Sequence, residues 1–237
     1  MSSDSAVSFN RTNLDKYLSE LGKEYRKLGG KRMPAEIILI GGASVLVNYG
    51  FRDSTTDIDA FISAASTMKE AINRVADRCG LPDNWLNADF KRTESYSVKI
   101  LQYSVYYKTF AGVLTVRTIA GEYLIAMKLR AGRKYKFDLS DVIGILADHK
   151  RNDKVIMLED IKRAAAELYG SWEKIPEFSR IYITEVFKNG DFETMLTNIS
   201  KEERANREEL IDNGWSDALV ITEKNASDIL AALKKED

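Results

Sequence analysis

The run Ile37-Ile38-Leu39-Ile40 ends at Gly41-Gly42 and constrains the fold more than any other segment. Consecutive β-branched and aliphatic residues bounded by glycine are typical of a buried strand that is covered on both faces. A helix is expected directly after the glycines, through residues 43–47, and a second strand over residues 57–62. The sequence therefore predicts an α/β beginning in which a central strand ends at a glycine turn.

The apolar spacing divides the rest of the chain into an α/β part and a helical part. Helices are expected at residues 11–28, 66–79, 121–132 and 138–148. Strands are expected at residues 98–110 and 113–119, joined as a hairpin by Ala111-Gly112. After residue 154 every signal is helical, over residues 157–169, 176–188, 191–211 and 226–235. The predicted organisation is an N-terminal helix (1–33), a core (34–150) and an all-helical C-terminal domain (151–237).

Scarce residue types exclude several kinds of chemistry. The 237 residues contain one Cys, Cys79, and one His, His149, which excludes an internal disulfide, a cysteine zinc site and catalysis by several histidines. His149 lies in a charged stretch and is interpreted as a solvated histidine in a loop or at a helix end. A net charge of −1 argues against a generally basic nucleic-acid binder. Chemistry must therefore depend on carboxylates, lysine, arginine, hydroxyls and backbone groups.

The sequence also predicts the compartment. No run approaches the roughly 18 apolar residues that a membrane span requires, so no membrane partner is expected. The first ten residues are polar and include Asp4, unlike a signal peptide. A cytoplasmic protein is expected.

The chemistry is predicted to lie at the glycine turn and the second strand. Backbone N–H groups at the start of a helix bind anions such as phosphate, and glycine lets the anion approach closely. Asp57 and Asp59 are two apart on the predicted strand, so both carboxylates point to one face, where they suit Mg²⁺. A glycine turn alone, or an Asp-x-Asp alone, has an ordinary structural explanation. Together they predict phosphoryl or nucleotidyl transfer.

The motif Gly41-Gly42-Ala43-Ser44, followed by Arg52-x-x-Thr55-x-Asp57-Ile58-Asp59, resembles the signature of the DNA polymerase beta-like nucleotidyltransferase superfamily. Its form is similar to the minimal, toxin-related branch, the AbiEii/MenT-type enzymes and their bacterial relatives. Trp85-Leu86-Asn87 resembles a further signature of those relatives, and Lys128, Arg133, Asp138 and Asp141 resemble their helical motif. The resemblance covers about residues 34 to 150.

This resemblance implies the nucleotidyltransferase fold, an α+β fold in which helices flank a small mixed sheet. It implies transfer of a nucleoside monophosphate from a nucleoside triphosphate, with Mg²⁺ or Mn²⁺ held by Asp57 and Asp59. Implied acceptors are an RNA 3′ end, such as that of a tRNA, or a protein hydroxyl, and an antitoxin-like protein is an implied partner. The alternative is a degenerate copy that kept the fold as a binding module. The implied catalytic residues are Asp57, Asp59, Lys128 and Asp138, and the implied nucleotide-binding residues are Gly41, Gly42, Ser44, Arg52, Thr55 and Arg133.

Lys128 also draws attention by itself, because it shares a helical face with Leu124 and Ala131. A lysine on an apolar face either extends to the surface or meets an anion. It lies in a basic segment, residues 91–136, with ten Lys and Arg against two Glu, a net charge of +8. Asp138 either interacts with the helix dipole or, as the resemblance implies, orients Lys128 or Arg133 by ion pairing.

One departure from the superfamily is visible. Many members carry a third acid on a later strand, and residues 113–119 contain none. Either two aspartates suffice, or Asp138 supplies the third acid from a helix, or the enzyme is degenerate.

Overall fold

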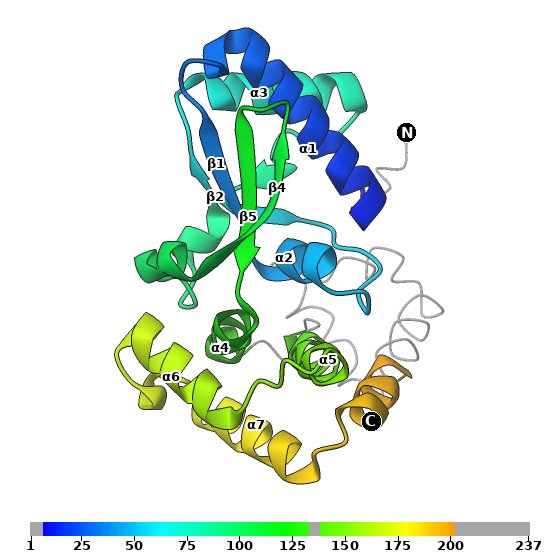
Figure 1. Cartoon of the computed structure of the whole chain (residues 1–237), viewed down its shortest axis with the longest axis vertical. Coiled ribbons are helices and arrows are strands. Elements are labelled where there is room, and N and C mark those ends of the chain that lie inside the picture. Colours follow the sequence, from blue (N-terminus) through cyan, green and yellow to red (C-terminus); the bar gives the residue numbers. More distant parts are fainter. Residues whose placement is uncertain (1–6, 133–137, 202–237) are drawn as a thin grey trace, which may run out of the picture.

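A five-stranded mixed sheet lies at the centre of the structure, a computed structural model that describes residues 7–132 and 138–201 (Figure 1). The strand order is β3-β2-β1-β5-β4. Strand β1 pairs antiparallel with β2 and parallel with β5, while β3 pairs parallel with β2 and β4 antiparallel with β5. The strands are β1 (Ala35–Leu39), β2 (Ile58–Ser63), β3 (Leu86–Asn87), β4 (Ser104–Phe110) and β5 (Leu114–Ile119).

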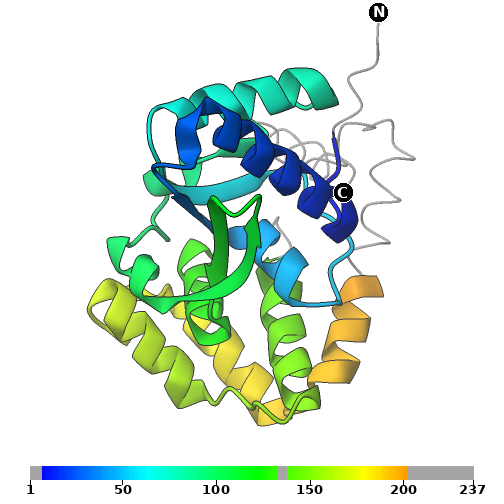
Figure 2. The same cartoon turned by 45° about the horizontal axis from the view of Figure 1, so that its top comes forward.

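The described residues form seven named helices: α1 (Arg11–Tyr25), α2 (Gly41–Asn48), α3 (Thr67–Cys79), α4 (Gly121–Ala131), α5 (Asp138–Arg151), α6 (Leu158–Tyr169) and α7 (Glu177–Asn189). Residues 192–201 are also helical. Short turns of helix complete the order: η1 (Arg26–Gly30), η2 (Asp89–Arg92), η3 (Val98–Tyr103) and η4 (Trp172–Lys174). Figures 1 and 2 show α1 and α3 together at one end of the molecule and α4 to α7 together at the other.

Strand β1 separates two hydrophobic clusters, because its side chains alternate between the faces of the sheet. Ile37 and Leu39 pack with α1, α3 and the inner residues of β2. Ile38 and Ile40 pack with α4, α5, α6 and α7. All four side chains are at most 3% exposed, which confirms the prediction of a central strand covered on both faces.

Most predicted elements are confirmed, and the α+β class with a small mixed sheet and C-terminal helices is the one expected. The hairpin is present, since β4 and β5 pair antiparallel around Ala111 and Gly112, both at positive φ. The helix predicted over residues 226–235, and residues 202–211 of another, lie outside the described residues.

The strand predicted over residues 98–110 begins only at Ser104, so the prediction was wrong for residues 98–103. Residues 98–103 form the turn η3, in which the Ser97 hydroxyl accepts a hydrogen bond from the Lys99 N–H (3.3 Å). Ile100, Leu101 and Tyr103 all contact the same hydrophobic cluster. An extended strand would turn Ile100 and Leu101 to opposite faces, so packing overrides the local alternation.

His149 lies in the last turn of α5, as the helix-end interpretation expects, but it is half-buried and bonded. Its ring nitrogens lie 3.2 Å from the Tyr49 hydroxyl and 2.9 Å from the Lys154 carbonyl oxygen. Helices on both sides of residue 150 share one hydrophobic cluster. The division into domains at that residue stays a prediction. Within the described ranges, no helix combines the length and the apolar character needed to cross a membrane.

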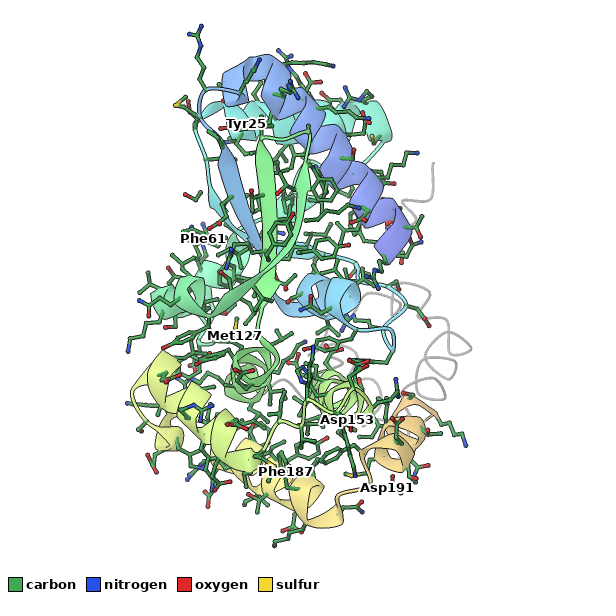
Figure 3. The ribbon with its side chains drawn as sticks, viewed as in Figure 1. Tyr25, Phe61, Met127, Asp153, Phe187 and Asp191 are labelled. Carbon is green, nitrogen blue, oxygen red and sulfur yellow. The ribbon has the colours of Figure 1, made fainter. Side chains whose placement is uncertain are left out.

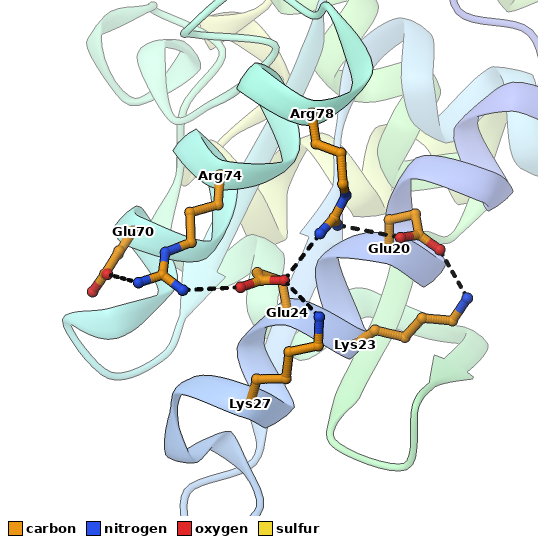
Figure 4. A network of polar contacts seen from close by, with 7 residues as sticks. All are labelled: Glu20, Lys23, Glu24, Lys27, Glu70, Arg74 and Arg78. Carbon is orange, nitrogen blue, oxygen red and sulfur yellow. Dashed lines mark hydrogen bonds and ion pairs between the residues drawn. The ribbon is translucent and has the colours of Figure 1, made fainter.

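A buried carboxylate, Glu24, joins α1 to α3 (Figure 4). It accepts hydrogen bonds from Arg74 and Arg78, each at 3.1 Å, and from Lys27 at 3.2 Å. Its side chain is 6% exposed, whereas those of the two arginines are 49% and 42% exposed. The bonds from Arg78 and Arg74 lower the pKa of Glu24 to about 2.

We expect Glu24→Gln to lower the free energy of unfolding by about 1–2 kcal/mol at pH 7, since solvent around the arginines weakens the pairs. A carboxyl whose pKa falls on folding stabilises the fold above its unfolded value, 4.5. That contribution disappears as pH falls from 4.5 toward 2, so the variant and the native chain should converge there. Urea titrations from pH 7 to pH 2 measure this. Glu70→Gln, which removes an exposed pair with Arg74, is the control, expected to cost about 0.5 kcal/mol or less. Equal, pH-independent losses would contradict the prediction.

Candidate functional site

The glycine turn joins β1 to α2 and is packed tightly by its surroundings. Gly41 has a φ of +57°, a conformation that favours glycine. A Cβ on Gly42 would lie 2.7 Å from Thr55 Oγ1 and 2.9 Å from Arg52 Nη2. No side chain caps α2, whose first N–H groups have no partner within the helix. The turn thus offers backbone donors at a helix start, and position 42 has no space for a side chain.

Both predicted metal-binding aspartates lie beside this turn. Ile58 and Ala60 are fully buried, whereas Asp57 is exposed and Asp59 half-buried. Asp59 Oδ2 lies 3.9 Å from the position of a Cβ on Gly41. Asp57 Oδ1 accepts a hydrogen bond from Thr55 Oγ1 (3.2 Å), the atom that packs against Gly42. Asp59 therefore lies next to Gly41, whereas Asp57 is linked to Gly42 only through the Thr55 hydroxyl.

Strand β3 places Asn87 directly beside Asp59, which sequence reasoning did not foresee. Leu86 and Asn87 pair in parallel register with Ile58 and Asp59. Trp85 fixes the approach of this strand, because its indole N–H donates to the Ile72 carbonyl oxygen of α3 (3.3 Å). The Trp-Leu-Asn segment was noted only as a resemblance, and the register gives it a place next to the site.

Arg52, Lys128, Asp138 and Asp141 form a charge cluster that links the loop after α2 to α4 and α5. Arg52 Nη1 lies 2.8 and 2.6 Å from the two carboxylate oxygens of Asp141. Lys128 Nζ donates to Asp141 Oδ2 (2.6 Å) and to Asp138 Oδ1 (2.8 Å). The exposed fraction is 15% for Arg52, 7% for Lys128 and 3% for each aspartate. Asp141 thus contacts both cations.

The cluster is formally neutral, with two cations and two carboxylates. Burial disfavours the charge of Lys128, but Asp138 and Asp141 outweigh it, and the pKa of Lys128 is raised. An ammonium has three hydrogens to donate, and the two aspartates take two of them. Lys128 therefore does not extend to the surface but contacts an anion, and that anion is provided by the protein's own aspartates. The contact of Asp138 with Lys128 agrees with the alternative in which Asp138 orients this lysine. A catalytic role for either residue stays a prediction.

Ser44 and Thr55 are held by the protein's own contacts. Ser44 is fully buried, and its hydroxyl accepts a hydrogen bond from the Ile119 N–H of β5 (3.2 Å). Thr55 is 4% exposed and forms an isolated β-bridge with Phe9. Both residues thus have structural contacts, Ser44 through its hydroxyl and Thr55 through its backbone bridge. Phosphate binding by either residue stays a prediction. Arg133 lies outside the described residues.

The positive charge of the basic segment is largely distributed among separate pairs. Lys108 pairs with Asp15, Arg117 with Glu36, and Arg130 with Glu94. Lys91 is exposed and lies 4.6 Å from the centroid of the Phe61 ring, on β2 beyond Asp59. The segment therefore does not form one concentrated positive site within the part of the chain that is described.

The donor set suits a hard cation only in part. No three His, Cys, Asp or Glu side chains among the described residues come together as a metal site. Asp138 contacts Lys128 and belongs to no such group of three among the described residues, so it does not join Asp57 and Asp59 as a third acid. Mg²⁺ is commonly bound by one or two carboxylates, with water and substrate phosphates as further ligands. Asp57 and Asp59 fit that pattern.

Gly41, Asp59 and Lys128 line one cleft between the sheet and α4, together with residues of the segment 90–95. A helix start, a carboxylate and a buried ammonium thus face the same space. Residues 16–145, more than half of the chain, match the family described as "Nucleotidyltransferase of unknown function (DUF6036)". The chain belongs to this nucleotidyltransferase family. No curated protein and no solved structure matches the chain.

Every candidate site residue, from Gly41 to Asp141 and with Arg133 included, lies within the matched residues 16–145 of this nucleotidyltransferase. The family description names no toxin, so membership of the toxin-related branch stays a prediction. Asp141 and Asn87 are the two residues whose place in the site became visible only in three dimensions.

We expect Gly42→Ala to lower the free energy of unfolding by about 1–3 kcal/mol, because its Cβ would press on Thr55 and Arg52, which hydrogen bonds hold in place. Gly50→Ala is the matched control, since its Cβ would meet nothing within 4 Å. That control should be neutral or stabilising by up to about 1 kcal/mol. Chemical denaturation of both variants makes the comparison, and equal stability of the two would show that position 42 is not crowded.

Asp141→Asn removes the carboxylate that contacts both cations of the charge cluster. We expect a loss of about 3 kcal/mol in unfolding free energy, since a buried cation without its partner is costly. Glu193→Gln, which breaks an exposed pair with Arg151, should cost less than about 1 kcal/mol. The two variants are compared by urea denaturation at pH 7. A loss at Asp141 no larger than that at Glu193 would refute the structural importance of the cluster.

Proposed function

We propose that this chain is a Mg²⁺-dependent nucleotidyltransferase that moves a nucleoside monophosphate from a nucleoside triphosphate to an acceptor hydroxyl and releases pyrophosphate. The observation that carries this proposal is the shared cleft of Gly41, Asp59 and Lys128. Phosphate, metal and developing negative charge would each meet a suitable group there. Membership of a nucleotidyltransferase family supports the same reaction class.

The proposed roles follow from the contacts of each residue. Asp57 and Asp59 would hold Mg²⁺, which lowers the charge of the reacting phosphates when bound. The N–H groups after Gly41 and Gly42 would bind phosphate oxygens. Lys128 would direct its remaining hydrogen to the phosphates while Asp138 and Asp141 hold the other two. Arg52, held in place by Asp141, would act on the phosphates beside Gly42.

The acceptor and the partner are proposed from the resemblance to toxin-related enzymes. The acceptor would be an RNA 3′ end, such as that of a tRNA, or a protein hydroxyl. An antitoxin-like protein would keep the enzyme silent in the cytoplasm. A small neighbouring gene for such a partner is the simplest observation that would support this part.

A second candidate function is favoured by the acid count. The described residues contain no cluster of three potential metal ligands, whereas many members of the superfamily have a third acid. A degenerate nucleotidyltransferase fold would still bind a nucleotide without transferring it. The two functions therefore differ in turnover and not in binding.

Incubation with each labelled nucleoside triphosphate, Mg²⁺, and either total RNA or protein tests the proposal. Label in RNA or protein is the expected result. Stabilisation against heat by a nucleotide without any transferred label would favour the binding module. A result that shows no nucleotide binding and no transferred label would contradict both functions.

Asp59→Asn should lower the transfer rate by about 100-fold or more, because a bound metal contributes several kcal/mol to the transition state. Volume and shape are retained, so the folded fraction, followed by circular dichroism, should stay near that of the native chain at the assay temperature. Asp77→Asn, on α3 outside the cleft, controls for the loss of one surface charge. Native-level transfer by a folded Asp59→Asn protein would refute the role of Asp59.

A further inference from the structure

The segment between α2 and β2, residues 49–55, which we call the Arg52 loop, is docked on α5. Besides the ion pair of Arg52 with Asp141, this loop contacts the same helix through Phe51. A Cβ on Gly144 would lie 2.4 to 2.6 Å from three atoms of the Phe51 ring. Glycine inside a helix is less favourable than alanine. The missing side chain at position 144 is what lets the ring lie directly on the helix.

The Phe51 ring has little freedom to turn away from α5. It is half-buried, and Tyr49 stacks on it at a centroid distance of 5.8 Å and an interplanar angle of 29°. Tyr49 itself is 6% exposed and belongs to the hydrophobic cluster that α4, α5 and α6 share. Displacement of the Phe51 ring would therefore move the backbone of the loop, and Arg52 is the next residue.

A further contact with α5 is made by His149, the sole histidine of the chain. Its Nδ1 lies 2.9 Å from the Lys154 carbonyl oxygen, which can only accept, so Nδ1 carries the hydrogen of the neutral ring. Nε2 then accepts from the Tyr49 hydroxyl at 3.2 Å. Burial, and then the charges of Asp148 and Glu122, raise the pKa of Tyr49, so the phenol keeps the hydrogen that it donates.

The other end of the Arg52 loop is held by a different part of the chain. The Phe9 N–H donates to the Thr55 carbonyl oxygen (2.7 Å), and the Thr55 N–H donates to the Phe9 carbonyl oxygen (2.8 Å). Between the two anchors, Arg52 Nε donates to the Ser54 carbonyl oxygen at 3.0 Å. Arg52 Nη2 lies 2.9 Å from the position of a Cβ on Gly42. The guanidinium therefore lies at the glycine turn within a loop that is fixed at both ends.

We infer that Tyr49 and Phe51 are positioning residues, which hold the Arg52 guanidinium at the glycine turn through their contacts with His149 and Gly144 of α5. The inference deepens the proposed function and rests on it where Arg52 acts on phosphates. The positioning itself does not require the reaction. It gives α5 a part in the site without any contact between these four residues and a ligand.

Gly144→Ala tests the inference, because its Cβ should displace the Phe51 ring and Arg52 with it. Hydrogen exchange of the Arg52 Nε–H, followed by ¹⁵N NMR and assigned by its loss in Arg52→Lys, reports on the guanidinium directly. The exchange should become about tenfold faster or more, since the local contacts open. In a Phe51→Ala background the same change should add less than about twofold, because the ring to be displaced is gone.

Phe187→Ala, on α7 (Figure 3), is the matched control, because Phe187 is also half-buried and packs against the same hydrophobic cluster as Phe51. It should lower the urea midpoint and change the Arg52 exchange rate by less than about twofold. Phe51 would have a merely structural role if Gly144→Ala gave that same result, and the inference would be overturned.

Tyr49→Phe is a second variant, which keeps the ring and removes the hydroxyl that contacts His149. It should raise the Arg52 exchange rate about threefold or more, and it decides the question if Gly144→Ala does not fold. An unchanged exchange rate in the folded variants would overturn the inference.

Calorimetry with Mg²⁺ and ATP, GTP, CTP or UTP connects the loop to the site. Folded Gly144→Ala and Tyr49→Phe proteins should bind the preferred nucleotide about fivefold more weakly or less tightly still, because a displaced Arg52 no longer meets the phosphates. Faster exchange with native nucleotide affinity would overturn the link between the loop and the site. If the native chain binds none of the four nucleotides, the proposed function fails, while the exchange rates still decide whether the loop positions Arg52.

Discussion

The carboxylate of Asp141 is the contact on which the candidate site depends. From α5 it reaches Arg52 in the loop after α2 and Lys128 on α4, at 2.6 to 2.8 Å. A side chain that is 3% exposed and paired in this way fixes three chain segments relative to one another. Arg52 in turn packs against Gly42, so the shape of the glycine turn depends on a helix nearly a hundred residues later.

The sheet register determines what faces this cluster. Asp59 pairs with Asn87 on one side, and its carbonyl oxygen accepts the Ile40 N–H on the other (2.9 Å). A slip of one residue in β2 would turn Asp59 into the cluster around α1 and α3, where Ile58 and Ala60 now lie. The buried pair Ile58 and Ala60 therefore positions the two aspartates as much as the glycines do.

The sequence predicted what depends on local patterns. The run of residues 37–40, the glycine turn and the Asp-x-Asp all predicted neighbouring elements, and the structure brings them together. Contacts between residues distant in the chain were harder to predict. Lys128 could be expected to need an anion, but no local pattern shows that this anion is Asp141 and not a ligand. The strand prediction for residues 98–103 was wrong for a related reason, because the packing of Ile100 and Leu101 against one cluster decides their conformation.

Charge in the site explains why metal and nucleotide would act together. Arg52 pairs with Asp141, and Lys128 pairs with Asp138 and Asp141, so these four residues are formally neutral. Asp57 and Asp59 add two negative charges near the glycine turn. The backbone N–H groups at the start of α2 favour a phosphate locally, whereas the carboxylates of Asp57 and Asp59 do not. A divalent cation between Asp57 and Asp59 would cancel the excess. The paired aspartates of α5 thus fix the direction in which Arg52 and Lys128 can donate, so that Lys128 would offer its third hydrogen to the phosphates beside the metal.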